Sequence, residues 1–120
     1  MPLRLRPLWV SLGWAMVVLI VWFSLEPRPP EVAPQLGDKA QHLLAYFGLM
    51  FWFGQLHARR LPVALGCLGL GLSLEWLQGL TGYRTASGLD MLANTAGVLL
   101  AWTAVRGLPN VLARLESRWT

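Results

Sequence analysis

Long apolar runs alternate with short polar, Pro-rich or Gly-rich breaks along most of the chain. Four of these runs have about the length that an α-helix needs to cross the hydrocarbon core of a bilayer, roughly 20 residues. They cover about residues 8–25, 39–57, 61–80 and 89–106. The pattern therefore predicts an all-α protein, an integral membrane four-helix bundle. Residues 107–120 are expected to form a short amphipathic tail along the membrane, with Glu116 on its polar side.

The breaks between the runs predict how the spans connect. The first break, EPRPPEVAPQLG, holds four Pro residues, which favour an extended, non-helical connection. The second break, HARR, is so short that its two neighbouring spans are expected to form an antiparallel hairpin. The first span follows a basic leader, as a cleaved signal peptide would, but its length and aromatic content favour a retained helix. We therefore expect a single membrane domain over residues 1–120.

Composition and charge agree with a membrane protein. Hydrophobic residues make up 55% of the chain and charged residues only 13%, which leaves no room for a separate soluble domain. The net charge is +4, but the basic residues are scattered without the stripe typical of nucleic-acid binding, so no nucleic acid is expected as a partner. In a four-span arrangement most arginines fall on one side, which predicts that both termini are cytoplasmic. These arginines are Arg4, Arg6, Arg59, Arg60, Arg106, Arg114 and Arg118.

Polar residues interrupt three of the predicted spans at helical spacing. An ionisable side chain in hydrocarbon costs about 3 kcal/mol on insertion scales, so each one indicates a partner or a function. Residues three or four apart share one helix face. The stripes are Asp38, His42 and Tyr46 in the second helix, Glu75 and Gln78 in the third, and Asp90 and Asn94 in the fourth. They are expected to meet in an outward-facing pocket, with Lys39 and Arg84 at its mouth.

Several of these residues also have a structural interpretation. Ser87 and Asp90 fit the S-x-x-D capping box at the start of the fourth span. Asp38 and Lys39 can mark the water interface at the start of the second span. A solitary His or Tyr on such a face is often a hydrogen-bonded structural residue. Glu75 is harder to explain in this way, because its apolar neighbours require a carboxylate that is neutral, paired or facing an aqueous pocket.

Three segments, DKAQHLLAY, EWLQ and YRTASGLDMLANTAG, together resemble the VanZ-like family of small multi-span membrane proteins. The family pattern is approximately D-K-x-x-H-x-x-x-[YF], E-x-x-Q and R-x-x-S-x-x-D-x-x-x-N-x-x-G. Its positions fall on Asp38, Lys39, His42, Tyr46, Glu75, Gln78, Arg84, Ser87, Asp90, Asn94 and Gly97. The resemblance covers about residues 38–101, and it departs from the pattern at Ala101, where a second glycine is expected.

The resemblance implies a multi-pass protein of the bacterial inner membrane that acts in the cell envelope. It also implies a connection with susceptibility to the glycopeptide antibiotic teicoplanin, since the family is named after a teicoplanin-resistance protein. The positions that match the family pattern from Asp38 to Asn94 become the expected ligand-binding residues.

The predicted pocket supports three hypotheses for function. In the first, the protein binds a lipid-linked or surface ligand whose phosphate or carboxylate meets Lys39 and Arg84. In the second, it is a membrane-embedded enzyme, and His42, Glu75 or Asp90 performs acid–base chemistry on a lipid-linked envelope precursor. A small transporter is the third hypothesis, and the nearly apolar inner half of the four spans disfavours it.

Metal ions, cofactors and disulfides receive no support from the sequence. Its His and carboxylate residues are scattered, without the short spacing typical of a metal site, so no metal and no cofactor is predicted. The single cysteine, Cys67, lies in an apolar run, which predicts a packed thiol. The lipid bilayer is the partner that the sequence requires, and a homo-oligomer is compatible with it.

Overall fold

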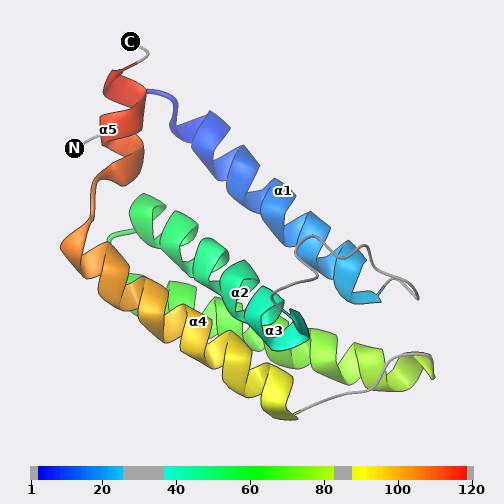
Figure 1. Cartoon of the computed structure of the whole chain (residues 1–120). Helices are drawn as coiled ribbons and strands as arrows, with labels where there is room; N and C mark the ends of the chain where they lie inside the picture. Colours follow the sequence, from blue (N-terminus) through cyan, green and yellow to red (C-terminus); the bar gives the residue numbers. More distant parts are fainter. Residues whose placement is uncertain (1–2, 26–36, 83–87, 119–120) are drawn as a thin grey trace.

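The computed structural model describes residues 3–25, 37–82 and 88–118, with residues 37–39 described by their backbone alone. These ranges hold five helices and no strand. The helices are α1 (Arg6–Leu25), α2 (Gly37–Leu56), α3 (Arg60–Thr81), α4 (Gly88–Gly107) and α5 (Val111–Ser117), shown in Figure 1. The all-α prediction is therefore confirmed, and each of the four long helices begins and ends within two residues of a predicted run.

Local sequence explains where the long helices begin and end. Pro7 and Pro62 lie in the first turns of α1 and α3, where the missing N–H removes no intrahelical hydrogen bond. α3 ends at Thr81 and is followed by Gly82, whose φ of 78° lies in the left-handed region. Glycine adopts this conformation without the steric penalty that a side chain brings, so Gly82 stops the helix.

Three of the described helices, α1, α3 and α4, are long and apolar enough to cross a membrane. α2 is not among them, although it has the same length of 20 residues as α1. It lies between the other long helices and packs against each of them (Figure 1). Leu44 is the one exposed side chain between Ala40 and Leu56. Because protein surrounds most of α2, this helix can carry polar residues that a lipid-facing helix cannot.

α1, in contrast to α2, has many exposed side chains. It buries only Trp9 and Gly13, whereas Trp14, Val18 and Trp22 are more than half exposed, at 59%, 65% and 56%. Exposed aromatic and branched apolar side chains of this kind are typical of a helix that faces lipid.

The closest approach between helices joins α2 to α4 at Gly97. A Cβ atom at this position would overlap the backbone carbonyl oxygen of Leu43 and lie 3.0 Å from the backbone nitrogen of Phe47. Val98 and Ala101 are fully buried beside it. The small-residue face of α4 therefore lets the two backbones come together, and this contact fixes the register of α2 against α4.

The two ends of the chain meet in a contact that we call the terminal junction, formed by Arg4, Leu5, Trp9 and Glu116. The Glu116 carboxylate accepts hydrogen bonds from the backbone N–H groups of Arg4 and Leu5, the latter at 2.9 Å. It also accepts one from the Trp9 indole Nε1–H at 2.7 Å. Since backbone N–H groups at a helix start have no intrahelical partner, Glu116 of α5 caps the beginning of α1.

Glu116 is buried, with 3% of its surface exposed, whereas the sequence placed it on the polar side of the tail. The cause is that α5 packs back onto the other helices through Leu112, which contacts Trp9 and Leu56. Glu116 follows Leu112 by four residues and so shares its helix face. Burial alone raises the pKa of Glu116, but the hydrogen bonds from Trp9, Leu5 and Arg4 and the charge of Arg4 outweigh it and hold this pKa below its usual range.

Candidate functional site

One end of the molecule, which we call the polar end, gathers polar side chains from three helices. α2 and α4 begin at this end and α3 finishes there (Figure 1). His42 lies in the second turn of α2, Asp90 in the first turn of α4, and Glu75 in the last two turns of α3. The up-and-down course of the chain therefore brings residues that are far apart in sequence to one level.

His42 is held between two residues of α4. Its Nδ1 lies 3.0 Å from Asn94 Oδ1, within hydrogen-bond distance, and its Nε2 lies 3.8 Å from Asp90 Oδ2. The Asn94 amide nitrogen faces the Met91 sulfur at 3.8 Å, so its oxygen is the atom that meets the imidazole. A carboxamide oxygen can only accept a hydrogen bond, and Nδ1 must therefore carry the proton. Nε2 is the ring nitrogen on the side of Asp90.

Glu75 completes a group of three possible metal ligands. His42, Glu75 and Asp90 each offer one ligand atom, and these atoms all lie within 4.8 Å of one another. We call these three residues and Asn94 the polar cluster. Two carboxylates and an imidazole at this spacing can share a proton, hold a cation or act together on a bound ligand.

The polar cluster is largely withdrawn from solvent. Glu75 and Asp90 are each 6% exposed and Asn94 is 1% exposed. His42 is the most accessible member, with 17% of its side chain exposed. Electrostatic interactions among these side chains are therefore stronger than they would be in water.

Tyr46 flanks the polar cluster one turn further along α2. Its ring and the Asn94 amide both lie over Gly71 of α3, where a Cβ atom would be 2.9 Å from Asn94 Nδ2 and 3.4 Å from the Tyr46 ring. Gly71 therefore makes room for both side chains. Sequence analysis did not single out Gly71, because its role depends on which face of α3 meets the other two helices.

The remaining expected site residues have different positions. Gln78 is buried, but its Nε2 donates a hydrogen bond of 2.7 Å to the backbone oxygen of Ser24, so its amide joins α3 to α1. The side chains of Asp38 and Lys39 lie outside the described residues, and so do Arg84 and Ser87. Of the ten residues expected in the pocket, the structure thus brings together His42, Glu75, Asp90 and Asn94, with Tyr46 beside them.

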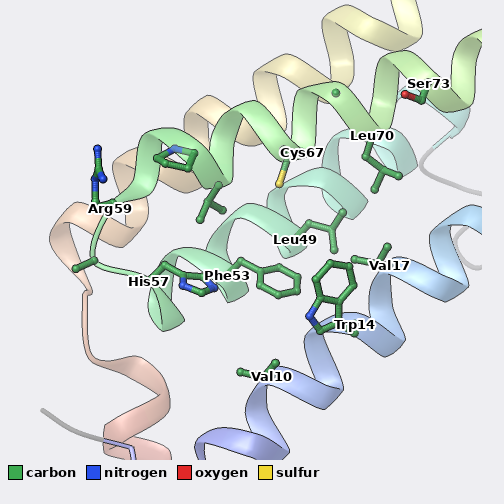
Figure 2. A pocket seen from close by; sticks show the side chains of 15 residues that line it. Val10, Trp14, Val17, Leu49, Phe53, His57, Arg59, Cys67, Leu70 and Ser73 are labelled. Carbon is green, nitrogen blue, oxygen red and sulfur yellow. The ribbon is translucent and has the colours of Figure 1, made fainter.

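A large apolar cavity lies away from the polar cluster, between α1, α2 and α3 and towards the end of α2 (Figure 2). Its volume is about 910 Å³, and its walls include Trp14, Leu49, Phe53 and Cys67. No member of the polar cluster lines it. This cavity could not be predicted from the sequence, because the packing of α1 against its neighbours has no spacing signature.

Comparisons of the chain with models of known protein families, with curated proteins and with solved structures found no match. The VanZ-like family therefore stays a prediction from the residue pattern.

Proposed function

We propose that this chain is a VanZ-like, multi-pass protein of the bacterial inner membrane, a four-helix bundle with both termini in the cytoplasm. In this arrangement the polar end faces outward and binds the anionic head group of a lipid-linked or surface ligand of the cell envelope. The observation that carries the proposal is the meeting of His42, Glu75, Asp90 and Asn94 at one level of a largely apolar helical protein. Buried polar groups of this density are costly and mark functional sites in membrane proteins.

The anionic character of the ligand is inferred from two basic residues. Lys39 precedes His42 by three residues on α2, and Arg84 precedes Asp90 by six. Ammonium and guanidinium groups bind phosphate and carboxylate oxygens through charge-assisted hydrogen bonds. The partial exposure of His42 supports entry of a ligand from the polar end.

Ligand binding is tested with a polyprenyl phosphate as the probe and the matching polyprenol as the phosphate-free control, using native mass spectrometry of the purified protein. The double variant Lys39→Ala, Arg84→Ala is expected to bind the phosphate at least roughly tenfold more weakly. Arg59→Ala, Arg60→Ala removes the same charge from the opposite end and is expected to bind as the parent does. Equal binding by the parent and the Lys39, Arg84 variant overturns the proposal.

Orientation is tested separately by labelling single cysteines introduced into residues 27–37. We expect them to react with an impermeant reagent added outside the cell. Reaction from the cytoplasmic side alone would reverse the topology and place the polar end inside. The connection with teicoplanin is tested by comparing the drug susceptibility of cells with and without the protein.

An acid–base enzyme acting on a lipid-linked precursor is the second candidate, and the environment of His42 favours it. Asn94 fixes one ring nitrogen, and the other faces the Asp90 carboxylate, so the imidazole is oriented as a general base would be. This candidate requires turnover of the precursor by purified protein that His42→Ala and Glu75→Gln abolish. If no turnover occurs, ligand binding remains as the function.

A further inference from the structure

We propose that the polar cluster binds one divalent transition-metal ion, Zn²⁺ being the best fit, through His42 Nε2 and the carboxylates of Glu75 and Asp90. The inference rests on the proposed function, because it concerns the same site and names what makes that site attractive to an anion. Four kinds of observation support it: the spacing of the ligand atoms, the second contact of the imidazole, the charge balance and the ligand types.

The ligand atoms already lie near the positions that a metal ion requires. Zn²⁺ binds imidazole nitrogen and carboxylate oxygen at about 2.0–2.2 Å, so two ligands of a tetrahedral site are roughly 3.4 Å apart. His42 Nε2 and Asp90 Oδ2 are 3.8 Å apart, and all three ligand atoms lie within 4.8 Å of one another.

The second contact of His42 is the one that metal-binding histidines make. Such histidines donate the N–H of the ring nitrogen that does not bind the metal to an oxygen acceptor, which fixes both tautomer and ring orientation. Asn94 Oδ1 occupies this position, 3.0 Å from His42 Nδ1. With Nδ1 held by Asn94, Nε2 is the ring nitrogen on the side of Asp90.

Acidic ligands suit a cation. Glu75 and Asp90 each bring a carboxylate to the polar cluster. Carboxylate ligands offset the charge of a divalent ion when it binds, which is what allows a buried site to hold one. The bound ion would also add positive charge at the end where the proposed function places an anionic head group.

The ligand types select among metals. Imidazole suits Zn²⁺ and other transition metals, whereas Mg²⁺ and Ca²⁺ prefer sites made of oxygen ligands alone. Three protein ligands also leave a fourth position of Zn²⁺ open to water or to another oxygen. A phosphate oxygen is a ligand of this type, so a bound ion would give the head group of the proposed function a direct point of attachment.

The test uses untagged protein that has been purified in detergent, stripped with EDTA and exchanged into metal-free buffer. We expect about one Zn²⁺ per chain by elemental analysis after equilibration, and Co²⁺ to give the absorption bands of a tetrahedral site. Glu75→Gln, Asp90→Asn and His42→Ala are each expected to weaken Zn²⁺ binding at least roughly tenfold. His57→Ala removes the other histidine of the chain and should leave binding unchanged.

Folding of each variant is checked by its elution profile and thermal unfolding in metal-free buffer, and Glu75→Gln and Asp90→Asn are the informative variants because they nearly preserve shape. The proposal is overturned if the parent binds well below one Zn²⁺ per chain. The proposal is also overturned if the Glu75→Gln and Asp90→Asn variants both fold and bind Zn²⁺ with the affinity of the parent. Loss of Zn²⁺ binding in His57→Ala would overturn it as well.

Measuring polyprenyl phosphate binding with Zn²⁺ and with EDTA separates this inference from the proposed function. If both hold, Zn²⁺ strengthens lipid binding. If the protein binds Zn²⁺ but binds no polyprenyl phosphate either with Zn²⁺ or with EDTA, the proposed function is contradicted and the metal site is supported. Lipid binding by a protein that takes up no Zn²⁺ supports the proposed function and overturns the metal site.

Discussion

Carboxylates are buried at both ends of this molecule, but the groups that surround them differ. At the terminal junction the Glu116 carboxylate accepts hydrogen bonds from two backbone N–H groups and an indole N–H. At the polar cluster Glu75 and Asp90 lie close to each other around one imidazole, whose tautomer is set by Asn94. The first carboxylate holds two chain segments together, and its negative charge is stabilised by the donors around it.

The difference shows how burial alone fails to separate structural from functional acids. Glu116 and Glu75 are similarly buried, at 3% and 6% exposed. What distinguishes them is the kind of neighbour that the described residues provide: N–H groups of Arg4, Leu5 and Trp9 around Glu116, and a second carboxylate and an imidazole around Glu75. The N–H groups stabilise the charge of Glu116 where it is, whereas two carboxylates and an imidazole at this spacing can share a proton or a cation.

The largest expected effect comes from the contact that assembles the polar cluster. Gly97→Ala places a Cβ atom against the backbone of Leu43, so α2 and α4 must move apart, and we expect a loss of about 3 kcal/mol in the free energy of unfolding. Gly69→Ala is the matched control, because nothing lies within 4 Å of its Cβ position, and it should not destabilise the protein. Thermal unfolding in detergent measures both. Equal unfolding temperatures for the two variants would contradict the close contact.

Glu116→Ala is expected to have the next largest effect, a clear fall in unfolding temperature that remains smaller than that of Gly97→Ala. The substitution leaves the Trp9 indole and two backbone N–H groups without their acceptor, but it spares the contacts among α2, α3 and α4. Glu116→Gln keeps one acceptor oxygen and should fall between Glu116→Ala and the parent. A parental unfolding temperature for Glu116→Ala would show that the terminal junction adds nothing.

The same chemical change in the polar cluster should have a smaller effect. In Glu75→Gln an amide N–H takes the place of one carboxylate oxygen near Asp90 and can donate a hydrogen bond to it, so we expect the metal-free protein to lose less stability than Glu116→Gln loses. Glu116→Gln, measured beside it, should lose stability. If both substitutions destabilise the protein to the same extent, the two ends do not differ in the way described above.

The smallest effect is a pH dependence that belongs to the terminal junction. The pKa of Glu116 is lower in the folded protein than in the unfolded chain, so its ionised form stabilises the fold. This contribution is complete above the unfolded pKa of about 4.3 and is lost as the pH falls through the lower, folded pKa. Unfolding temperatures between neutral and acidic pH should therefore fall less steeply in Glu116→Gln than in the parent. Identical pH profiles would contradict the lowered pKa.

The helices could be predicted from the sequence because their signals are local. Long, mainly apolar runs separated by Pro, Gly or charged residues predicted the boundaries to within two residues. The four-residue spacing from Asp90 to Asn94 also placed both on one face of α4, and both contact His42. Helical periodicity carries this kind of information directly.

What the sequence could not supply are the partners that depend on packing between helices. Gln78 shares a face with Glu75, yet its amide reaches the Ser24 carbonyl of α1. Glu116 has the polarity of a surface residue, and only the return of α5 onto α1 buries it. Periodicity identifies the face of a helix but not the neighbour that this face will meet.

The terminal junction also has a consequence for the order of events at the ribosome. Glu116 follows Arg4 by 112 residues, so the donors at the start of α1 cannot receive their acceptor until α5 has been made. α1, which buries little of its own surface, therefore spends most of translation without the cap that the finished fold provides. α5 thus secures the beginning of α1, and a chain truncated before Glu116 would lack this cap altogether.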